Sequence, residues 1–510
     1  MKLRSVLGVS ILAGWSVVLG LHIRREYFRS EGERLEAGVK TLAPGSYFYI
    51  VRMQGRAIGT AASRLDTLAD TIFVEDNLLL DVPALDTVTR AVTVSRLDLD
   101  TRLRVRKFSF RLDSRIGSFT ARGEMQADSS LDVRLQAGGT EQRSRIPANG
   151  GVTLDAAVPL RLAAAGRLAP GTAVTVLTFD PSAMATRSMT VRVTARDTLI
   201  VPDSSRVENN TWVMSSLDTV PVWRLEQQVG GIVVSSWVDE DGMMVRAESP
   251  LGFVIERTTY ELAKQEWVDA GRDASAKSGY GVLIESTAIE SDVDAGGLAA
   301  LDRLSVRLKG VSLEGFDLSG GRQQLRGDTL TITVEPLDVV RGSGYRLPYR
   351  AVDSVALELN PTPLIQSDDP EIRRVARRVT QGTTDPDAAA QRLNQFVYRT
   401  LRKEITPSIP SALQVLQSRR GDCNEHTVLY VALARSIGLP ARTAVGLVHL
   451  GGRFYYHAWP EVWLNERWIP VDPTLDQFPA DASHIRFLVG GLARQIELLR
   501  LIGRLEIDVL

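Results

Sequence analysis

The side chain best suited to nucleophilic chemistry in this 510-residue sequence is its single cysteine, Cys423. A lone thiol cannot form an intrachain disulfide, so it is either an inert buried group or a reactive one. Two later segments favour reactivity, because His457 can act as a base and Asp472 can orient that base. Thiol, imidazole and carboxylate together predict a triad that attacks carbonyl carbon.

The residues around Cys423 predict that it begins a helix. A short helix is expected to start at Ser411, a loop follows over residues 418–422, and an apolar stripe ends before Gly438 and Pro440. The positive end of the helix dipole favours a thiolate, and free first-turn amides can donate to an oxyanion. We therefore expect a lowered pKa for Cys423, with its own amide as one oxyanion donor; a second donor is not assigned.

His457 and Asp472 are predicted to share one face of a β-hairpin. Strands over residues 454–464 and 467–472 would pair so that Trp459 lies opposite Asp472. His457 and Asp472 then become diagonal neighbours roughly 7–8 Å apart. Trp459 points to the same side, where it could line a cleft or simply pack. The alternative is a strand with a bulge, which would break this register, because a proline follows Trp459 and prolines within sheets occur at bulges or on edge strands.

Four blocks of sequence around these residues occur in a fixed order. They resemble the core of the bacterial transglutaminase-like family, over about residues 369–489, and comprise residues 421–426 (GDCNEH), 432–442 (ALARSIGLPAR), 457–462 (HAWPEV) and 468–474 (WIPVDPT). The resemblance implies a papain-like α+β core in which Cys423 is the nucleophile, His457 the base and acid, and Asp472 the group that orients the imidazole. It also implies amide chemistry through a thioester acyl-enzyme.

The resemblance leaves the second half-reaction open. We expect hydrolysis of protein or peptide amides, because water is always present, and transfer to an amine, which cross-links proteins, is the alternative. A non-enzymatic binding or scaffold protein of the cell envelope is the competing class. His426 stands three residues after Cys423, but two ligands without a further cysteine make a poor zinc site, so neither a metal nor a cofactor is predicted.

The first half of the chain has the pattern of an antiparallel sheet. Period-two alternation in short runs separated by turns predicts strands with one wet face, for example over residues 91–97, 103–112, 131–135 and 189–194. Segments at residues 54–59, 95–112 and 237–242 weakly resemble periplasmic β half-barrels of the lipoprotein-carrier type. That resemblance implies a concave apolar surface for a lipid or protein ligand, and a spacer without a ligand is the alternative.

The N-terminus predicts a membrane segment. An uncharged run over residues 5–23 lies between basic residues and, at roughly 1.5 Å per residue, can just cross a thin hydrocarbon core. Because no small-residue cleavage site follows, an uncleaved anchor is favoured over a signal peptide. Basic residues on both sides leave the orientation open. With 60 Lys and Arg against 61 Asp and Glu, no global field attracts nucleic acid.

Taken together, the sequence predicts a multidomain α+β protein attached to a membrane and facing the bacterial periplasm or the cell exterior. A second β region is expected after the first, either as a separate small domain or as its completion. The predicted segments are a membrane anchor or signal segment (1–27), a juxtamembrane linker (28–43), an antiparallel β domain (44–270), the second β region (278–360) and the catalytic domain (365–510).

Overall fold

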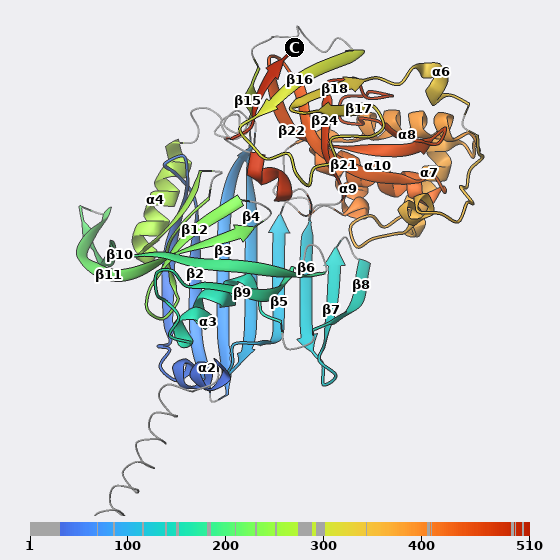
Figure 1. Ribbon diagram of the computed structural model, residues 1–510. Coiled ribbons are helices and arrows are strands. Elements are labelled where there is room, and N and C mark those ends of the chain that lie inside the picture. The colour runs from blue at the N-terminus through green and yellow to red at the C-terminus, as the bar shows by residue number, and fades with distance from the viewer. Residues whose placement is uncertain are drawn as a thin grey trace, which may run out of the picture.

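The computed structural model describes residues 31–510, except residues 274–287, 292–300 and breaks of up to four residues elsewhere. Two bodies are visible in Figure 1: a large sheet made from the first half of the chain, and an α+β body that lies over the ends of the cyan strands. Among the described residues, no helix is long and apolar enough to cross a membrane. The predicted membrane segment, residues 5–23, lies outside the described residues.

The first half of the chain forms one antiparallel sheet of 14 strands, in the order β8-β7-β6-β5-β4-β3-β2-β1-β14-β13-β12-β11-β10-β9. The predicted large antiparallel region is therefore confirmed. Its strands are β1 (Gly45–Met53), β2 (Arg56–Leu68), β3 (Thr71–Ala84), β4 (Thr87–Asp100), β5 (Val105–Ser114), β6 (Ser118–Met125), β7 (Ser130–Ala137), β8 (Thr140–Pro147), β9 (Ala173–Asp180), β10 (Ala185–Glu208), β11 (Thr211–Val229), β12 (Ile232–Val238), β13 (Met244–Glu248) and β14 (Phe253–Thr258).

Helices of the same region cover the apolar face of this sheet. Helix α3 (Val158–Ala164) follows a 3-10 turn, η1 (Asp155–Ala157), and buries Leu160 and Val158 in two different core clusters. Helix α2 (Glu31–Val39) packs beside it, so closely that a Cβ on Gly38 would lie 1.9 Å from the Ala164 carbonyl oxygen. The predicted juxtamembrane linker thus contains a helix that belongs to the β region.

Residues of α2 and α3 thus pack on the apolar surface that the half-barrel resemblance implies. The main hollow on the opposite face, of about 690 Å³, is lined largely by charged side chains of alternate strand positions, such as Arg96, Glu75 and Arg122. Helix α4 (Tyr260–Asp273) lies at the end of the predicted β domain, and it buries Ala263 against the sheet.

The C-terminal body has helices packed on a second sheet, in the order β15-β22-β21-β24 with β23 paired to β22. Its elements are β15 (Ile289–Glu290), η2 (Val355–Leu359), α7 (Pro370–Thr380), α8 (Pro386–Thr400), β19 (Arg402–Lys403), α9 (Ala412–Ser418), β20 (Arg420–Gly421), α10 (Cys423–Ser436), β21 (Ala441–Leu450), β22 (Arg453–Leu464), β23 (Arg467–Pro470), β24 (His484–Val489) and η3 (Ile496–Leu501). Helix α10 is the central helix, since its residues 429–434 are all buried.

The second β region belongs to this C-terminal body. Strands β16 (Arg303–Lys309), β17 (Gln323–Arg326) and β18 (Thr329–Thr333) form a sheet with the last strand of the chain, β25 (Glu506–Val509), and the short helix α6 (Leu337–Val340) follows β18. One core cluster joins residues of β16 and β18 to residues of β21, β22 and β24. The sequence left open whether this region is a separate small domain or completes the first sheet; in the structure, β16 pairs with β25 at the far end of the chain.

The two bodies touch where η3 meets β12 and also close to the α10 segment. Gln414 of α9 donates from Nε2 to the Ser118 carbonyl oxygen at the start of β6, at 2.8 Å. Leu364 and Ile409 pack against the apolar cluster of the β region. The large sheet thus supports the element that immediately precedes Cys423.

Candidate active site

Cys423 is the first residue of α10, as predicted. Asp422 is the N-cap, and its side chain accepts a hydrogen bond from the Asn424 amide at 2.8 Å. The Glu425 carboxylate in turn accepts a hydrogen bond from the Asp422 amide at 2.9 Å. This reciprocal capping box fixes the start of the helix. Gly421 precedes it with a φ of +152°, and a Cβ there would lie 2.1 Å from that of Glu425, so a glycine is required.

The thiol of Cys423 is half-buried and accepts a hydrogen bond from the backbone amide of Ala458 on β22. The predicted lowering of its pKa is wrong for this environment. Burial raises the pKa of Cys423 well above the ordinary value, and the negative charge of Asp422 raises it further, against a smaller opposite effect of the Ala458 amide. The thiol therefore needs a base to remove its proton.

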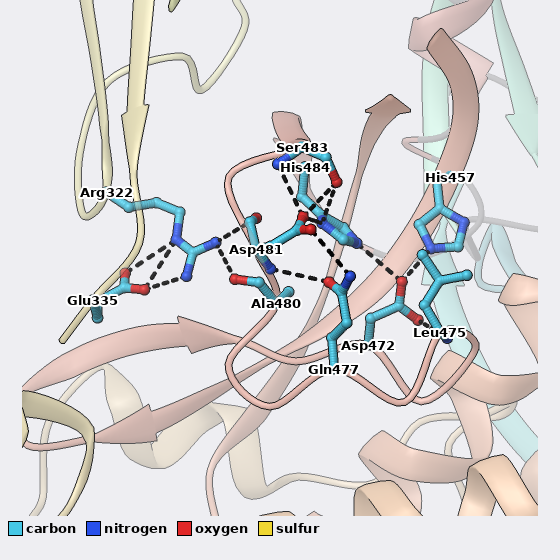
Figure 2. Close-up of polar contacts among 10 residues, drawn as sticks. All are labelled: Arg322, Glu335, His457, Asp472, Leu475, Gln477, Ala480, Asp481, Ser483 and His484. Atoms are coloured by element: carbon cyan, nitrogen blue, oxygen red, sulfur yellow. Dashed lines mark hydrogen bonds and ion pairs between the residues drawn. The ribbon is translucent and has the colours of Figure 1, made fainter. Parts of the chain in front are cut away.

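The hairpin that carries His457 has the predicted register, with Leu464 opposite Arg467. Strand β23 ends at Pro470, however, two residues earlier than predicted. The chain then turns, and Asp472 exchanges backbone hydrogen bonds with Gln477, both at 2.9 Å. In this position Asp472 Oδ2 lies 2.7 Å from His457 Nε2 (Figure 2). The predicted His–Asp contact is thus present, although a turn rather than a ladder position makes it.

Asp472 is fully buried and accepts several hydrogen bonds. Its Oδ1 receives the amides of Thr474 at 2.7 Å and Leu475 at 3.1 Å, and its Oδ2 faces two imidazoles. Burial alone would raise the pKa of Asp472, but the charge and hydrogen bond of His457, with those of His484, hold it well below its usual range. Asp472 is therefore an ionised acceptor that fixes the His457 ring, with Nε2 as the nitrogen it binds.

His484 is a member of this group that the sequence reasoning missed. It lies on β24, and its Nε2 is 2.9 Å from the same Oδ2 atom of Asp472. No motif or spacing marks it in the sequence. The available signal was weak: a histidine within an apolar strand pattern points inward, but only the pairing of β24 with β21 decides what it meets.

Trp459 is buried rather than exposed to an open cleft, with 1% of its surface accessible. Its ring stacks on His457 at a centroid distance of 6.0 Å and meets His484 edge to face at 5.2 Å. Trp459 therefore packs against both imidazoles, whose ring centroids are 5.7 Å apart, and so takes the packing role that the sequence left open beside a cleft-lining one.

One group among the described residues has the composition of a metal site. The ligand atoms of His457, Asp472 and His484 lie within 4.8 Å of one another. Both imidazoles already bind the carboxylate through hydrogen bonds, and a metal on His457 would remove its capacity to move a proton. We therefore treat the group as an acid–base assembly. His426 is outside it; its Nδ1 lies 2.6 Å from the Asp422 carbonyl oxygen, within α10.

Comparison with known proteins agrees with this part of the chain. Residues 373–473 match the family model of the Transglutaminase-like superfamily. The C-terminal quarter is thus transglutaminase-like, as the sequence predicted. The matched stretch contains Cys423, His457 and Asp472 and ends before His484. A comparison with curated proteins gives no match.

Solved structures show more distant similarity. A protein from Cytophaga hutchinsonii described as a "putative cysteine protease" is 16% identical, with a TM-score of 0.28 over 41% of this chain and 81% of that one. A β-barrel-like protein of unknown function from Brucella abortus is 13% identical, with a TM-score of 0.30 over 42% and 95% of the two chains. A Pseudomonas aeruginosa protein of another uncharacterised family is 16% identical, with a TM-score of 0.23 over 36% and 87%.

Proposed function

We propose that this protein is a cysteine enzyme that hydrolyses amides of proteins or peptides through a thioester acyl-enzyme. One observation carries the proposal. Cys423 begins α10, and its sulfur accepts a hydrogen bond from the backbone amide of Ala458, the residue after His457. The imidazole of His457 is in turn hydrogen-bonded to the buried carboxylate of Asp472. A nucleophile, a base and an orienting acid are thus joined through one short segment of β22.

The chemistry follows from which atoms are engaged. Asp472 binds Nε2 of His457, so Nδ1 is the nitrogen that takes the thiol proton from Cys423. The sulfur then attacks the amide carbonyl, and the Cys423 amide at the helix start donates to the resulting oxyanion. The His457 imidazolium returns its proton to the departing nitrogen as the C–N bond breaks, which leaves a thioester.

Hydrolysis completes the cycle with the same residues. His457 accepts a proton from water, the hydroxide oxygen attacks the thioester carbonyl, and the C–S bond breaks. The proton on His457 then returns to the sulfur of Cys423, so both groups recover their starting state. An amine in place of water would give cross-linking by the same steps, and amine transfer is the second outcome that the experiment must separate.

The test uses purified full-length protein, a glutamine-containing protein substrate and a fluorescent primary amine. We expect ammonia or a new amino terminus to be released without incorporation of the amine. Cys423→Ala should lower the rate by about 10⁴-fold or more. His449→Gln is a matched control, since His449 lies on β21 against Phe454, at a ring distance of 4.7 Å.

Incorporation of the amine faster than hydrolysis would replace the proposed hydrolase with a transferase. Equal rates for wild type and Cys423→Ala would show that the thiol does no chemistry and would favour a scaffold role. We further propose, from the N-terminal sequence, that the enzyme is attached to a membrane and faces the periplasm or the cell exterior, where protein or peptide substrates reach it.

A further inference from the structure

Four side chains form a continuous buried series next to Cys423. His457 meets Asp472, Asp472 meets His484, and the Nδ1 atom of His484 lies 3.3 Å from Oδ1 of Asp481. Figure 2 shows the series running from His457 through Asp472 and His484 to Asp481. The side chains of His484 and Asp472 are entirely inaccessible to solvent, so water does not supply missing partners to them.

Counting donors fixes the protonation of the middle imidazole. Ionised carboxylates only accept hydrogen bonds, and a neutral imidazole has one N–H. His484 faces a carboxylate oxygen at each ring nitrogen, so both contacts are favourable only when both nitrogens carry a proton. Ser483 cannot substitute as a donor to Nδ1, because its hydroxyl donates to Asp481 Oδ1.

The electrostatics agree with this count. Burial lowers the pKa of His484, but the hydrogen bonds and charges of Asp472 and Asp481 outweigh burial, and the net shift is upward. The same contacts lower the pKa of Asp481 to about 2. The titratable and charged groups that face the series from neighbouring elements are Cys423, Asp422, Glu425 and His426 at the start of α10, and the Arg322–Glu335 ion pair beside residues 480–481.

We propose that His484 is a positioning residue of the active site, which holds Asp472 as an imidazolium and offsets its negative charge, and so sets how tightly His457 binds the thiol proton. The inference rests on the proposed function, because it assigns His457 the role of base and acid. Asp472 alone would favour a strongly held proton on His457. A second cation on the same oxygen weakens that hold, which helps His457 release the proton to the leaving nitrogen.

Removal of the charge has consequences of opposite sign for two measurable steps. In His484→Gln, Asp472 keeps a neutral amide donor but loses the neighbouring cation. His457 then binds its proton more tightly, so the Cys423 thiolate and His457 imidazolium pair forms more readily and alkylation of Cys423 accelerates. Because the imidazolium becomes a weaker acid, the rate of amide turnover falls.

The decisive experiment measures both steps in full-length wild type and His484→Gln, with His449→Gln as the control. We expect the iodoacetamide rate at pH 7 to rise about tenfold, while kcat falls. The sole cysteine makes the alkylation signal specific. If neither rate changes, or if both fall in a variant whose Tm shows that it is folded, the proposal is overturned, because the two steps then do not respond to the charge with opposite sign.

A measurement on wild type guards against misfolded variants. In ¹⁵N-histidine NMR spectra at pH 7, we expect His484 to be protonated at both ring nitrogens, and a neutral His484 would overturn the proposal. Asp481→Asn should accelerate the alkylation of Cys423 by less than His484→Gln does, and slower alkylation would count against the proposal. The alkylation rate and the NMR spectra need no substrate. If wild type hydrolyses no amide, the proposed function is rejected, but these two measurements still decide the role of His484.

Discussion

At Cys423 two influences act on the same sulfur atom with opposite sign. The start of α10 places positive partial charge beside it, which favours a thiolate. Burial and the carboxylate of Asp422 act the other way, and the pKa of Cys423 is raised. The carboxylate that caps the helix is thus also the charge that opposes ionisation of its first residue. Stability of the helix and reactivity of the thiol are set in part by one side chain.

Asp422→Asn separates the two effects. Asparagine caps helices as well as aspartate does, but it carries no charge, so the pKa of Cys423 should fall. We expect alkylation at pH 7 to accelerate about three- to tenfold, with little change in Tm. Asp369→Asn is the matched control, because Asp369 caps α7 through the Glu371 and Ile372 amides. Slower alkylation of Asp422→Asn would contradict the charge argument.

The buried imidazole also makes a pH-dependent contribution to stability. The pKa of His484 is raised, so its contribution is fully present below about pH 6.5, the unfolded value, and is lost as the pH rises through the higher folded value. The pKa of Asp472 is lowered, so its contribution is present above about pH 3.9 and is lost on further acidification.

We therefore expect the Tm difference between wild type and His484→Gln to be greatest between about pH 4 and 6.5 and to shrink at alkaline pH. Thermal unfolding followed by circular dichroism from pH 4 to 9 measures it. A difference that grows steadily toward pH 9 is inconsistent with a protonated His484.

At the scale of elements, the small sheet beside the site holds the turn that carries its acid. Arg322, just before β17, forms a buried ion pair with Glu335, just after β18; their side chains are 5% and 7% exposed. The Nη1 group of Arg322 also donates to the carbonyl oxygens of Ala480 at 2.7 Å and Asp481 at 3.0 Å. The segment between Asp472 and His484 is thus attached to a sheet that is remote in sequence (Figure 2).

Arg322→Ala should destabilise the protein by about 3–5 kcal/mol, because it leaves the buried carboxylate of Glu335 without its partner. The double variant Arg322→Met with Glu335→Leu should recover much of that stability, since no buried charge remains. Both variants should have a lower kcat than wild type, because both lose the hydrogen bonds from Arg322 to the carbonyl oxygens of residues 480 and 481. Denaturant unfolding and kcat measure the two effects, and full activity in the double variant would rule out a role for this attachment.

At the scale of the whole molecule, the small sheet of the C-terminal body is built from two parts of the chain, β16 to β18 and β25. The segment that carries Cys423, His457 and Asp472 lies between these two parts in the sequence. The pairing of β16 with β25 brings residues 306–309 beside residues 506–509. Leu505 and Ile507 at the end of the chain are 4% exposed, and they lie in the same cluster as Phe454 and Phe487 of the second sheet. The catalytic fold is therefore larger than the stretch that carries its motifs.

A fragment of residues 365–510 should fail to fold, because it lacks β15 to β18 and leaves one face of this shared cluster exposed. A fragment of residues 278–510 retains that cluster and should show cooperative thermal unfolding. Expression of both fragments, followed by circular dichroism and Cys423 alkylation, tests the boundary. Cooperative folding of the shorter fragment would show that the small sheet is an accessory.

The N-terminal sequence makes a separate prediction for the whole chain. Deletion of residues 1–27 removes the uncharged segment but keeps α2, which packs on the β region. We expect the full chain in the membrane fraction after high-salt washing and the truncated chain in the supernatant, with unchanged Tm. Recovery of the full chain in the supernatant would remove the proposed membrane attachment.

The sequence by itself determined the local features of the site. The helix start at Ser411, the position of Cys423 at a helix start and the register around Leu464 depend on neighbours in the chain, and the structure has them all. Alternation in the first half predicted the antiparallel sheet for the same reason, since side-chain period reflects which face of one strand is buried.

Tertiary structure decided what those local features meet. The charge at Cys423 depends on burial and on a carboxylate aimed at it, which outweigh the helix terminus. His484 reaches Asp472 only because β24 pairs with β21, and the second β region found its partner about 200 residues away in β25. Contacts of this kind arise from non-local packing, and residue spacing along the chain carries little information about them.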